Sequence, residues 1–174
     1  MTRLSHNAPH AACDLIFRPA VPADFDELWP ILHEVFESGE SYPHRPGTTK
    51  EEGYRYWIET PTVSIVAILE GRIAGTYYLR PNQVGLGSHI ANAGYMVASW
   101  ARGLGIGRAL CLHSIEEAPK NGFKALQFNL VVASNAPAVH LWTSCGFTII
   151  GTIPKAFDHK RLGLTDAYIM HRFV

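Results

Sequence analysis

The sequence predicts an α/β (α+β) fold in which helices cover a mixed sheet, and three observations support this prediction. Two runs of apolar, β-branched and aromatic residues flank a Glu70-Gly71 turn, which is typical of a β-hairpin. A nearly continuous apolar run, Ala125 to Val132, lies between two helical patterns, as expected for a strand in the parallel part of a sheet. A glycine-rich turn at Arg102–Gly107 joins a strand pattern to a helix pattern.

Length and composition indicate a single domain. The chain has 174 residues, of which 47% are hydrophobic, and this suffices for one core. We expect residues 15–174 to form that domain and residues 1–14, which lack a continuous apolar run, to be a flexible tail. Fifteen basic and fifteen acidic residues cancel, so no global field attracts nucleic acid or an anionic membrane. No run of about 18 apolar residues indicates a membrane span.

The cysteines indicate a cytoplasmic protein without a bound metal. Cys13, Cys111 and Cys145 are odd in number, widely spaced and not arranged as metal ligands. We therefore expect reduced thiols, a cytoplasmic location and no metal site.

The first elements are a strand and a helix. Leu15 to Arg18 has a strand pattern, and Pro22 suits the opening of the helix that follows. Gly39 suits the C-cap of this helix. Pro30 lies inside the helical pattern and costs roughly 3 kcal/mol in a regular helix interior, so we expect a kink or a restart there.

A polar loop and a second short helix come next. Residues 40–47 are polar and rich in proline, which favours a loop. Thr49, with Glu52 three residues later, forms a capping-box pattern for a helix that Thr60-Pro61 closes.

The rest of the chain alternates strand and helix patterns. In order, we expect strands at Val63 to Leu69, Ile73 to Leu79 and Ile90 to Val97, a helix from Gly105 to about Asn121, a strand at Ala125 to Val132, a helix at Asn135 to Cys145, and strands at Thr148 to Ile153 and Ala167 to Phe173. A polar connection, Pro154 to Asp166, separates the last two strands.

The glycine turn is suited to bind a phosphate. Its glycines let the backbone approach a ligand closely, and the start of the following helix offers unpaired N–H groups and a partial positive charge. Arg108 stands where the dinucleotide-binding fingerprint requires glycine, and no Gly-Lys-Ser/Thr follows for a P-loop. The remaining pattern is R-x-x-G-x-G after a strand.

This pattern resembles the acyl-CoA pyrophosphate loop of the GNAT superfamily of N-acetyltransferases. A second segment, Asn135 to Phe147, is similar to another signature of the superfamily: an asparagine with alanine, then leucine with an aromatic residue, then Gly146-Phe147. The resemblance implies the GNAT fold, with a mixed sheet of about six to seven strands, about four helices, and parallel, splayed strands before and after the glycine turn. It also implies an enzyme that uses acetyl-CoA as co-substrate.

The same resemblance implies the donor site. The main chain of Met96 and Val97 would hold the pantetheine arm, and Asn135 would contact the pantetheine or the reacting region while also serving as an N-cap. The residues implied for the pyrophosphate are Arg102, Gly103, Leu104, Gly105, Ile106, Gly107 and Arg108.

One position departs from the superfamily pattern. The aromatic residue before the Gly-Phe signature is often a tyrosine that can protonate the departing thiolate, but here it is Trp142. An indole N–H cannot act as an acid near neutral pH, so a tyrosine acid at this position is excluded.

Several segments are similar to the fungal N-acetyltransferases that act on L-azetidine-2-carboxylate and related proline analogues. The similar segments are 37–43, 75–82, 92–95 and 128–131 with Asn135. By this resemblance, Tyr42 and Asn92 hold the acceptor, and Asn129 and Asn135 lie near the reacting nitrogen in the catalytic centre.

We therefore expect an N-acetyltransferase that acts on a small-molecule amine, a proline-like amino acid being the narrower candidate. We also expect a homodimer. A polyamine, an antibiotic or another amino acid are alternative acceptors, and Glu34, Glu37 and Glu40 form the only acidic cluster that could hold a polyamine. A non-catalytic acyl-CoA-binding module is the competing class. The sequence does not identify the base that deprotonates the amine, and the candidates are Glu37, Glu40, His140 and water.

Overall fold

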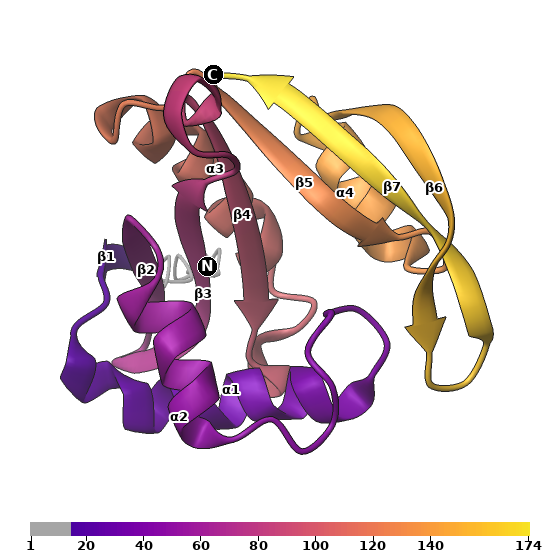
Figure 1. Ribbon diagram of the computed structural model, residues 1–174. Coiled ribbons are helices and arrows are strands. Elements are labelled where there is room, and N and C mark those ends of the chain that lie inside the picture. The colour runs from indigo at the N-terminus through magenta and orange to yellow at the C-terminus, as the bar shows by residue number, and fades with distance from the viewer. Residues whose placement is uncertain (1–14) are drawn as a thin grey trace, which may run out of the picture.

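The computed structural model describes residues 15–174, so the expected tail at residues 1–14 and Cys13 lie outside the described residues. In the described part, one seven-stranded sheet has the order β1-β2-β3-β4-β5-β7-β6 (Figure 1). The strands are β1 Ile16–Pro19, β2 Val63–Leu69, β3 Arg72–Pro81, β4 Ile90–Val97, β5 Ala125–Val132, β6 Thr148–His159 and β7 Gly163–Phe173. The helices are α1 Phe25–Ser38, α2 Lys50–Tyr54, α3 Ile106–Lys120 and α4 Ala136–Ser144.

The predicted mixed α+β fold is confirmed. Only β4 and β5 are parallel neighbours, and the other neighbouring strands of the described sheet are antiparallel. The predicted hairpin is formed by β2 and β3, and its turn residues Glu70 and Gly71 both have positive φ, as a tight hairpin turn requires. No helix within residues 15–174 combines the length and the apolar composition that a bilayer span needs.

The sheet splits between β4 and β5. These strands pair only where Ile90–Asn92 runs beside Ala125–Gln127, and then they diverge, as Figure 1 shows. The last pair is held by a side chain, because Asn92 Nδ2 donates a hydrogen bond of 3.1 Å to the carbonyl oxygen of Gln127. The predicted splaying is therefore present, and its vertex is at Asn92.

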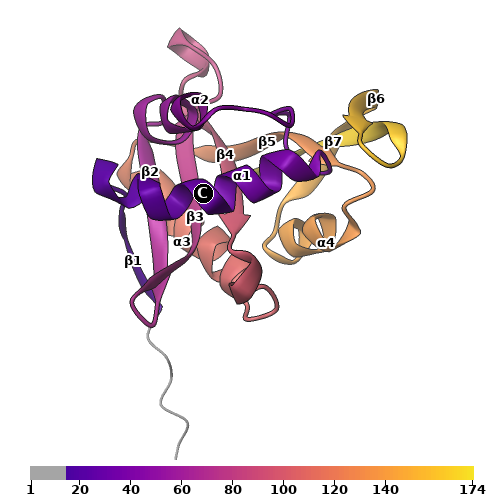
Figure 2. The ribbon, with the colours of Figure 1, turned by 90° about the horizontal axis from the view of Figure 1, so that it is seen from below.

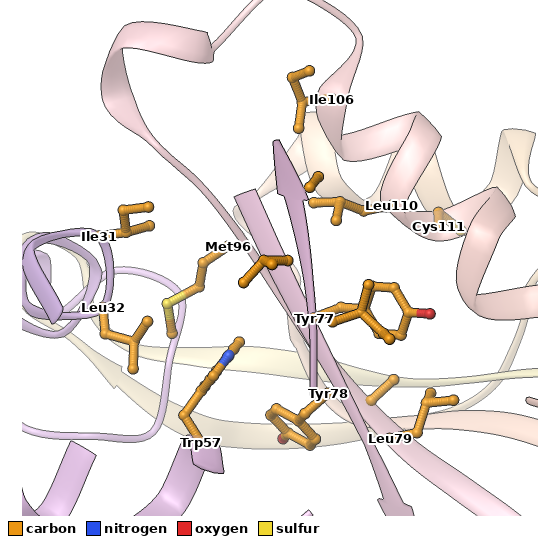
Figure 3. Close-up of a cluster of buried hydrophobic side chains, with 14 of the residues drawn as sticks. Ile31, Leu32, Trp57, Tyr77, Tyr78, Leu79, Met96, Ile106, Leu110 and Cys111 are labelled. Atoms are coloured by element: carbon orange, nitrogen blue, oxygen red, sulfur yellow. The ribbon is translucent and has the colours of Figure 1, made fainter. Parts of the chain in front are cut away.

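Successive side chains of β3 point to opposite faces of the sheet, and this alternation divides the core into two layers. Thr76 and Tyr78 contact Trp57, which follows α2, whereas Tyr77 hydrogen-bonds to His113 of α3. Figure 3 shows Trp57 and Tyr78 on one side of the strands and Tyr77 with the α3 side chains on the other. Figure 2 accordingly shows α2 and α3 on opposite sides of β3 and β4.

The predicted capping box at the start of α2 is confirmed. Thr49 Oγ1 accepts a hydrogen bond of 3.2 Å from the N–H of Glu52, and a Glu52 carboxylate oxygen accepts one of 2.8 Å from the N–H of Thr49. Beyond α2 the chain makes a π-helical turn, Arg55–Glu59, which brings Trp57 into the core with no exposed surface.

Two expectations differ from the structure. Helix α1 runs through Pro30 without a restart; Pro30 is exposed, so its ring lies on the solvent side. The polar connection expected at Pro154 to Asp166 is wrong, because β6 and β7 extend through most of it and leave only Lys160–Leu162 as the turn. Lys155, with a φ of 51°, lies in a bulge that lets the strand continue across this polar segment.

Replacing Thr76 by valine should destabilise the fold by about 1–3 kcal/mol, because it leaves the buried Trp57 indole N–H unpaired. Thr76 Oγ1 accepts from the Trp57 indole at 2.9 Å and donates to the Ile65 carbonyl at 2.8 Å. Urea denaturation measures the effect. Thr152→Val on the exposed face of β6 is the matched control and should change the unfolding free energy little. Equal effects of the two substitutions would contradict this account of the core.

Candidate active site

A cavity of about 360 Å³ lies where β4 and β5 separate. Its walls come from α1, the loop after α1, strands β3 to β5, and α4. Seven residues predicted from the sequence line it together: Tyr42, Asn92, Met96, Val97, Arg102, Asn129 and Asn135. The cavity is therefore the candidate active site.

The peptide groups of β4 alternate between β3 and the split. Asn82 N–H bonds to the Ile90 carbonyl, and Ala98 N–H bonds to the Ala74 carbonyl, so the even-numbered residues of β4 face β3. The carbonyl of His89 accepts from the N–H of Lys124, next to β5. The odd-numbered residues, Tyr95 and Val97 among them, therefore direct their peptide groups into the split.

The peptide group of Met96, which the resemblance implies for the pantetheine arm, faces β3 in this structure. Its carbonyl oxygen lies toward β3, only 3.0 Å from the position that a Cβ on Gly75 would occupy. The Met96 side chain is buried against α1 instead (Figure 3). The main-chain groups that face the split and are available to a ligand are those of Val97 and the N–H of Tyr95, because the Tyr95 carbonyl accepts a hydrogen bond from Tyr42.

The glycine turn has the geometry of an anion cradle. Gly103 and Gly105 have φ values of 80° and 79°, and a Cβ added to either would meet no atom within 4 Å. In the described chain, no backbone carbonyl accepts from the N–H groups of Gly103, Gly105 and the first three residues of α3, Ile106 to Arg108. Open space beside several unpaired N–H groups at a helix N-terminus suits a phosphate.

The two arginines predicted at the turn have protein partners. Arg102 Nη2 lies 2.8 Å from a carboxylate oxygen of Glu34 on α1. Arg108 Nη1 donates to Ser144 Oγ at 3.1 Å, near the end of α4. Both side chains are exposed, so these contacts can exchange for a bound anion, but the backbone supplies the donors that are unpaired.

At the far end of the cavity, a hydrogen-bond chain runs from Arg80 to Asn92. Arg80 Nη2 lies 3.4 Å from the Tyr56 hydroxyl, which lies 2.8 Å from the Tyr78 hydroxyl. Tyr78 donates to Asn92 Oδ1 at 3.2 Å, so it must accept from Tyr56. The guanidinium of Arg80 also stacks over the rings of Tyr56 and Tyr78, 4.8 and 5.1 Å from their centres.

Tyr42 reaches from the loop after α1 into the split. Its hydroxyl donates to the Tyr95 carbonyl at 3.1 Å. Gly94 makes room for this contact, since a Cβ there would lie 2.6 Å from the Tyr42 hydroxyl and 2.6 Å from the Tyr78 ring. Burial raises the pKa of the Tyr42 and Tyr78 hydroxyls well above the usual range, so both groups are neutral hydrogen-bond donors at physiological pH.

The two asparagines predicted in the catalytic centre have structural partners as well as a place on the cavity wall. Asn129 donates to Asn82 Oδ1 at 2.6 Å and accepts from Gln127 Nε2 at 2.8 Å, so these polar side chains of β5 have side-chain partners. Asn135 caps α4, because its Oδ1 accepts from the Ala138 N–H at 3.2 Å.

Trp142 forms an apolar wall of the cavity. Its ring lies 4.8 Å from the ring of Tyr95 and 5.0 Å from that of Phe128, measured between centroids. Phe128 in turn stacks on Phe147 at 4.3 Å. Trp142 stands at the position that is often a tyrosine in the GNAT superfamily, and here this side chain packs against other aromatic rings.

No aspartate, glutamate or histidine lines the cavity in the described chain. Glu34 pairs with Arg102, Glu37 accepts from the Gly47 N–H at 2.6 Å, and Glu40 pairs with Arg161 at 2.5 Å. The three acidic residues that could have bound a polyamine therefore contact other groups of the protein instead of the cavity. His140 is exposed on α4 and does not line the cavity either.

Sequence reasoning missed Arg80, Tyr56 and Tyr78 as site residues. Arg80 is the cavity cation without an ion pair within residues 15–174, but the sequence alone predicted no role for it. The available signal was the pair Tyr78 and Arg80, which share one face of β3 by alternation.

Comparisons with known proteins agree with this architecture. The model of the acetyltransferase (GNAT) family matches residues 25–147. N-acetyltransferase aca1 of Schizosaccharomyces pombe is 33% identical over 156 residues, which cover 80% of this chain and 74% of that protein. The L-amino acid N-acetyltransferase AaaT of Escherichia coli is 27% identical over 171 residues, which cover 98% of this chain and 88% of that protein.

Solved structures share the fold. A GCN5-related N-acetyltransferase from Kribbella flavida has a TM-score of 0.86 and 41% identity, covering 92% of this chain and 98% of that one. The putative acetyltransferase yncA from Salmonella typhimurium, solved with its cofactor acetyl-CoA, has a TM-score of 0.79 at 19% identity, covering 92% and 94%. Acetyl-CoA is thus bound in a structural homologue of this chain.

Replacing Gly105 by aspartate should weaken acetyl-CoA binding at least about a hundredfold, because a carboxylate would stand at the helix N-terminus that is to hold a phosphate. Isothermal titration calorimetry measures this affinity. Gly71→Asp is the matched control: Gly71 has a φ of 76° and similarly open surroundings, but it lies in the β2–β3 turn. Unchanged affinity of the Gly105 variant would overturn the assignment of the cradle.

Proposed function

This chain belongs to the acetyltransferase (GNAT) family and is an N-acetyltransferase that uses acetyl-CoA, and we propose on that premise that its acceptor is a small amino acid. A proline-like amino acid or analogue is the narrower candidate. One observation carries the proposal: the cavity has a cation, Arg80, available at its far end and no acidic side chain on its walls in the described chain. Such a lining favours a substrate that bears a carboxylate.

Arg80 is prepared to bind that carboxylate. Stacking on two tyrosine rings holds the guanidinium in place without neutralising its charge. A planar guanidinium can donate two parallel hydrogen bonds to a carboxylate, which fixes the orientation of the substrate as well as its position. The amine of an α-amino acid, one carbon away from the carboxylate, is thereby directed along the cavity toward the split.

The same lining argues against a polyamine. A polycation would need acidic side chains near its nitrogens, and Glu34, Glu37 and Glu40 have other partners. The resemblance to the proline-analogue acetyltransferases and the similarity to a bacterial L-amino acid N-acetyltransferase support the same substrate class.

The residues present fit acetyl-CoA in two places. Unpaired N–H groups of the glycine turn suit the pyrophosphate, and the peptide groups of Val97 and the N–H of Tyr95 in the split suit the amides of the pantetheine arm. When bound, acetyl-CoA supplies a thioester as acyl donor. The Val97 N–H, which faces the split, is the donor best oriented to stabilise negative charge on a carbonyl oxygen there.

The polar side chains of the cavity would position the acceptor. We assign Tyr42 and Asn92 to acceptor binding, with Asn129 and Asn135 near the reacting nitrogen. Asn92 is held by Tyr78 and by the Gln127 carbonyl, so its remaining N–H has a fixed direction. Fixed partners of this kind keep an amide oriented before the substrate arrives, which lowers the cost of alignment.

Water is the base that this cavity allows. An amine must lose a proton before or during transfer, and no carboxylate or imidazole lines the described cavity. The tyrosine hydroxyls are already protonated and so cannot act as bases, and asparagine amides cannot take a proton. The acceptor therefore reacts from its small unprotonated fraction, with its proton passed to solvent.

Replacing Arg80 by glutamine should raise the KM of an amino acid acceptor about ten- to a hundredfold and leave the affinity for acetyl-CoA unchanged. The comparison uses L-proline, azetidine-2-carboxylate and their carboxamides, with CoA release as the readout. The carboxamides should be equally poor for both enzymes, since they lack the charge that Arg80 binds. Arg72→Gln, at the exposed start of β3, is the control.

Two results would contradict this assignment. If Arg80→Gln acts equally on carboxylates and carboxamides, Arg80 does not bind the carboxylate. If the wild-type protein binds acetyl-CoA and turns over neither amino acids nor spermidine nor aminoglycosides, the non-catalytic module is the correct class.

The pH dependence follows from the absent base. Below the pKa of the acceptor amine, kcat/KM should rise about tenfold per pH unit, because the free amine increases in that proportion. The raised pKa of Tyr42 and Tyr78 keeps them protonated through this range, so they add no inflection. Burial lowers the pKa of His44, which is neutral above that pKa and lies outside the cavity. A plateau well below the amine pKa would reveal a protein base.

A further inference from the structure

The tip of the β6–β7 hairpin contacts the end of α1 on the other side of the split. The N–H of Lys160 donates to the Gly39 carbonyl at 3.1 Å, and Lys160 Nζ donates to the Glu37 carbonyl at 3.1 Å. Figure 1 shows the hairpin reaching down to the loop that follows α1. Two carbonyls at the end of α1, which the helix itself leaves without N–H partners, are thus satisfied by a distant part of the chain.

An ion pair adds to this contact. Arg161 Nε lies 2.5 Å from a carboxylate oxygen of Glu40. Contacts within the hairpin fix the conformation of its tip. The N–H of Arg161 donates to His159 Nδ1 at 3.1 Å, and His159 is buried against Phe157. The hairpin therefore presents Lys160 and Arg161 in a defined arrangement to the residues after α1.

The residues held in this way lead directly into the acceptor wall. Ser41, Tyr42 and Pro43 line the cavity and follow Glu40 without a break. Tyr42 is anchored at the other side of the wall by its bond to the Tyr95 carbonyl. This short wall is thus fixed at one end by the hairpin and at the other by β4, and the contact joins the β1–β4 half of the sheet to the β5–β7 half.

We propose that the hairpin tip is a positioning element of the acceptor site: Lys160 and Arg161 hold the wall Ser41–Pro43 in place and so restrict the acceptor to small amines. This inference rests on the proposed function, since it takes the cavity to be the acceptor site. A wall released from the hairpin would leave room for larger acceptors but would align small ones less well.

Gly39→Ala tests the proposal. A Cβ at this position would lie 3.2 Å from Lys160 Cβ, so Lys160 must shift by a few tenths of an ångström, which disturbs its contact with the end of α1. Gly122→Ala is the matched control, because Gly122 also has positive φ just beyond a helix end, at 83° against 60° for Gly39, but its Cβ would meet no atom within 4 Å. Both substitutions strain the backbone, and only the first disturbs the contact.

Relative to Gly122→Ala, Gly39→Ala should raise the KM of azetidine-2-carboxylate about five- to tenfold, with acetyl-CoA affinity unchanged. It should also raise the ratio of activity on a dipeptide to activity on the free amino acid. Arg161→Glu should act in the same direction, and the double variant Arg161→Glu with Glu40→Arg should restore the wild-type ratio. Equal kinetics of the two glycine variants, or no restoration by the charge exchange, would overturn the proposal.

Hydrogen–deuterium exchange separates this proposal from the proposed function, because it needs no substrate. In Gly39→Ala, residues 40–43 and 158–162 should exchange faster than in Gly122→Ala, while β2 and β3 should be unchanged. If exchange increases as expected but no amino acid is acetylated by the wild type, the hairpin holds the wall and the assigned acceptor is wrong. Unchanged exchange in both segments would contradict the positioning role itself.

Discussion

The divergence of β4 from β5 is the constraint on which the site depends. A sheet normally pairs the peptide groups of every inner strand, yet here pairing ends at Asn92 and Gln127. The peptide groups of Tyr95 and Val97 are left facing the gap, where Tyr42 donates to the Tyr95 carbonyl and the remaining groups need either water or a ligand. A pantetheine arm, which carries amides of its own, can complete the interrupted hydrogen bonding in the manner of an added strand. On our proposal, the incomplete sheet provides the site for acetyl-CoA.

The acceptor half depends on the same vertex. Asn92 holds the last pair of β4 and β5 through the Gln127 carbonyl, and its other end is held by Tyr78, Tyr56 and finally Arg80. The residue that begins the split is therefore connected to the cation that we assign to the substrate carboxylate. On our assignment, donor and acceptor meet at this point, because β4 offers its backbone to acetyl-CoA and also carries Asn92, which orients the acceptor.

Much of the fold follows from local signals in the sequence. The Glu70-Gly71 hairpin and the capping box at Thr49 were predictable because each depends on residues only a few positions apart. The β6–β7 hairpin was not, since Pro154 and Lys155 read as a loop, and only pairing with β7 keeps this segment extended. The roles of Met96 and Arg80 likewise depend on which neighbour each strand pairs with, and this is tertiary information.

Residue-resolved amide hydrogen exchange, measured by NMR with and without acetyl-CoA, tests the central claim most directly. The account predicts that acetyl-CoA protects the amides of Tyr95 and Val97, which face the split, together with those of Gly103 and of Gly105 to Arg108 in the cradle. The amide of Met96, which faces β3, should show little change. Protection at Met96 without Val97, or no added protection in β4 when acetyl-CoA is bound, would contradict the claim that the split is the donor site.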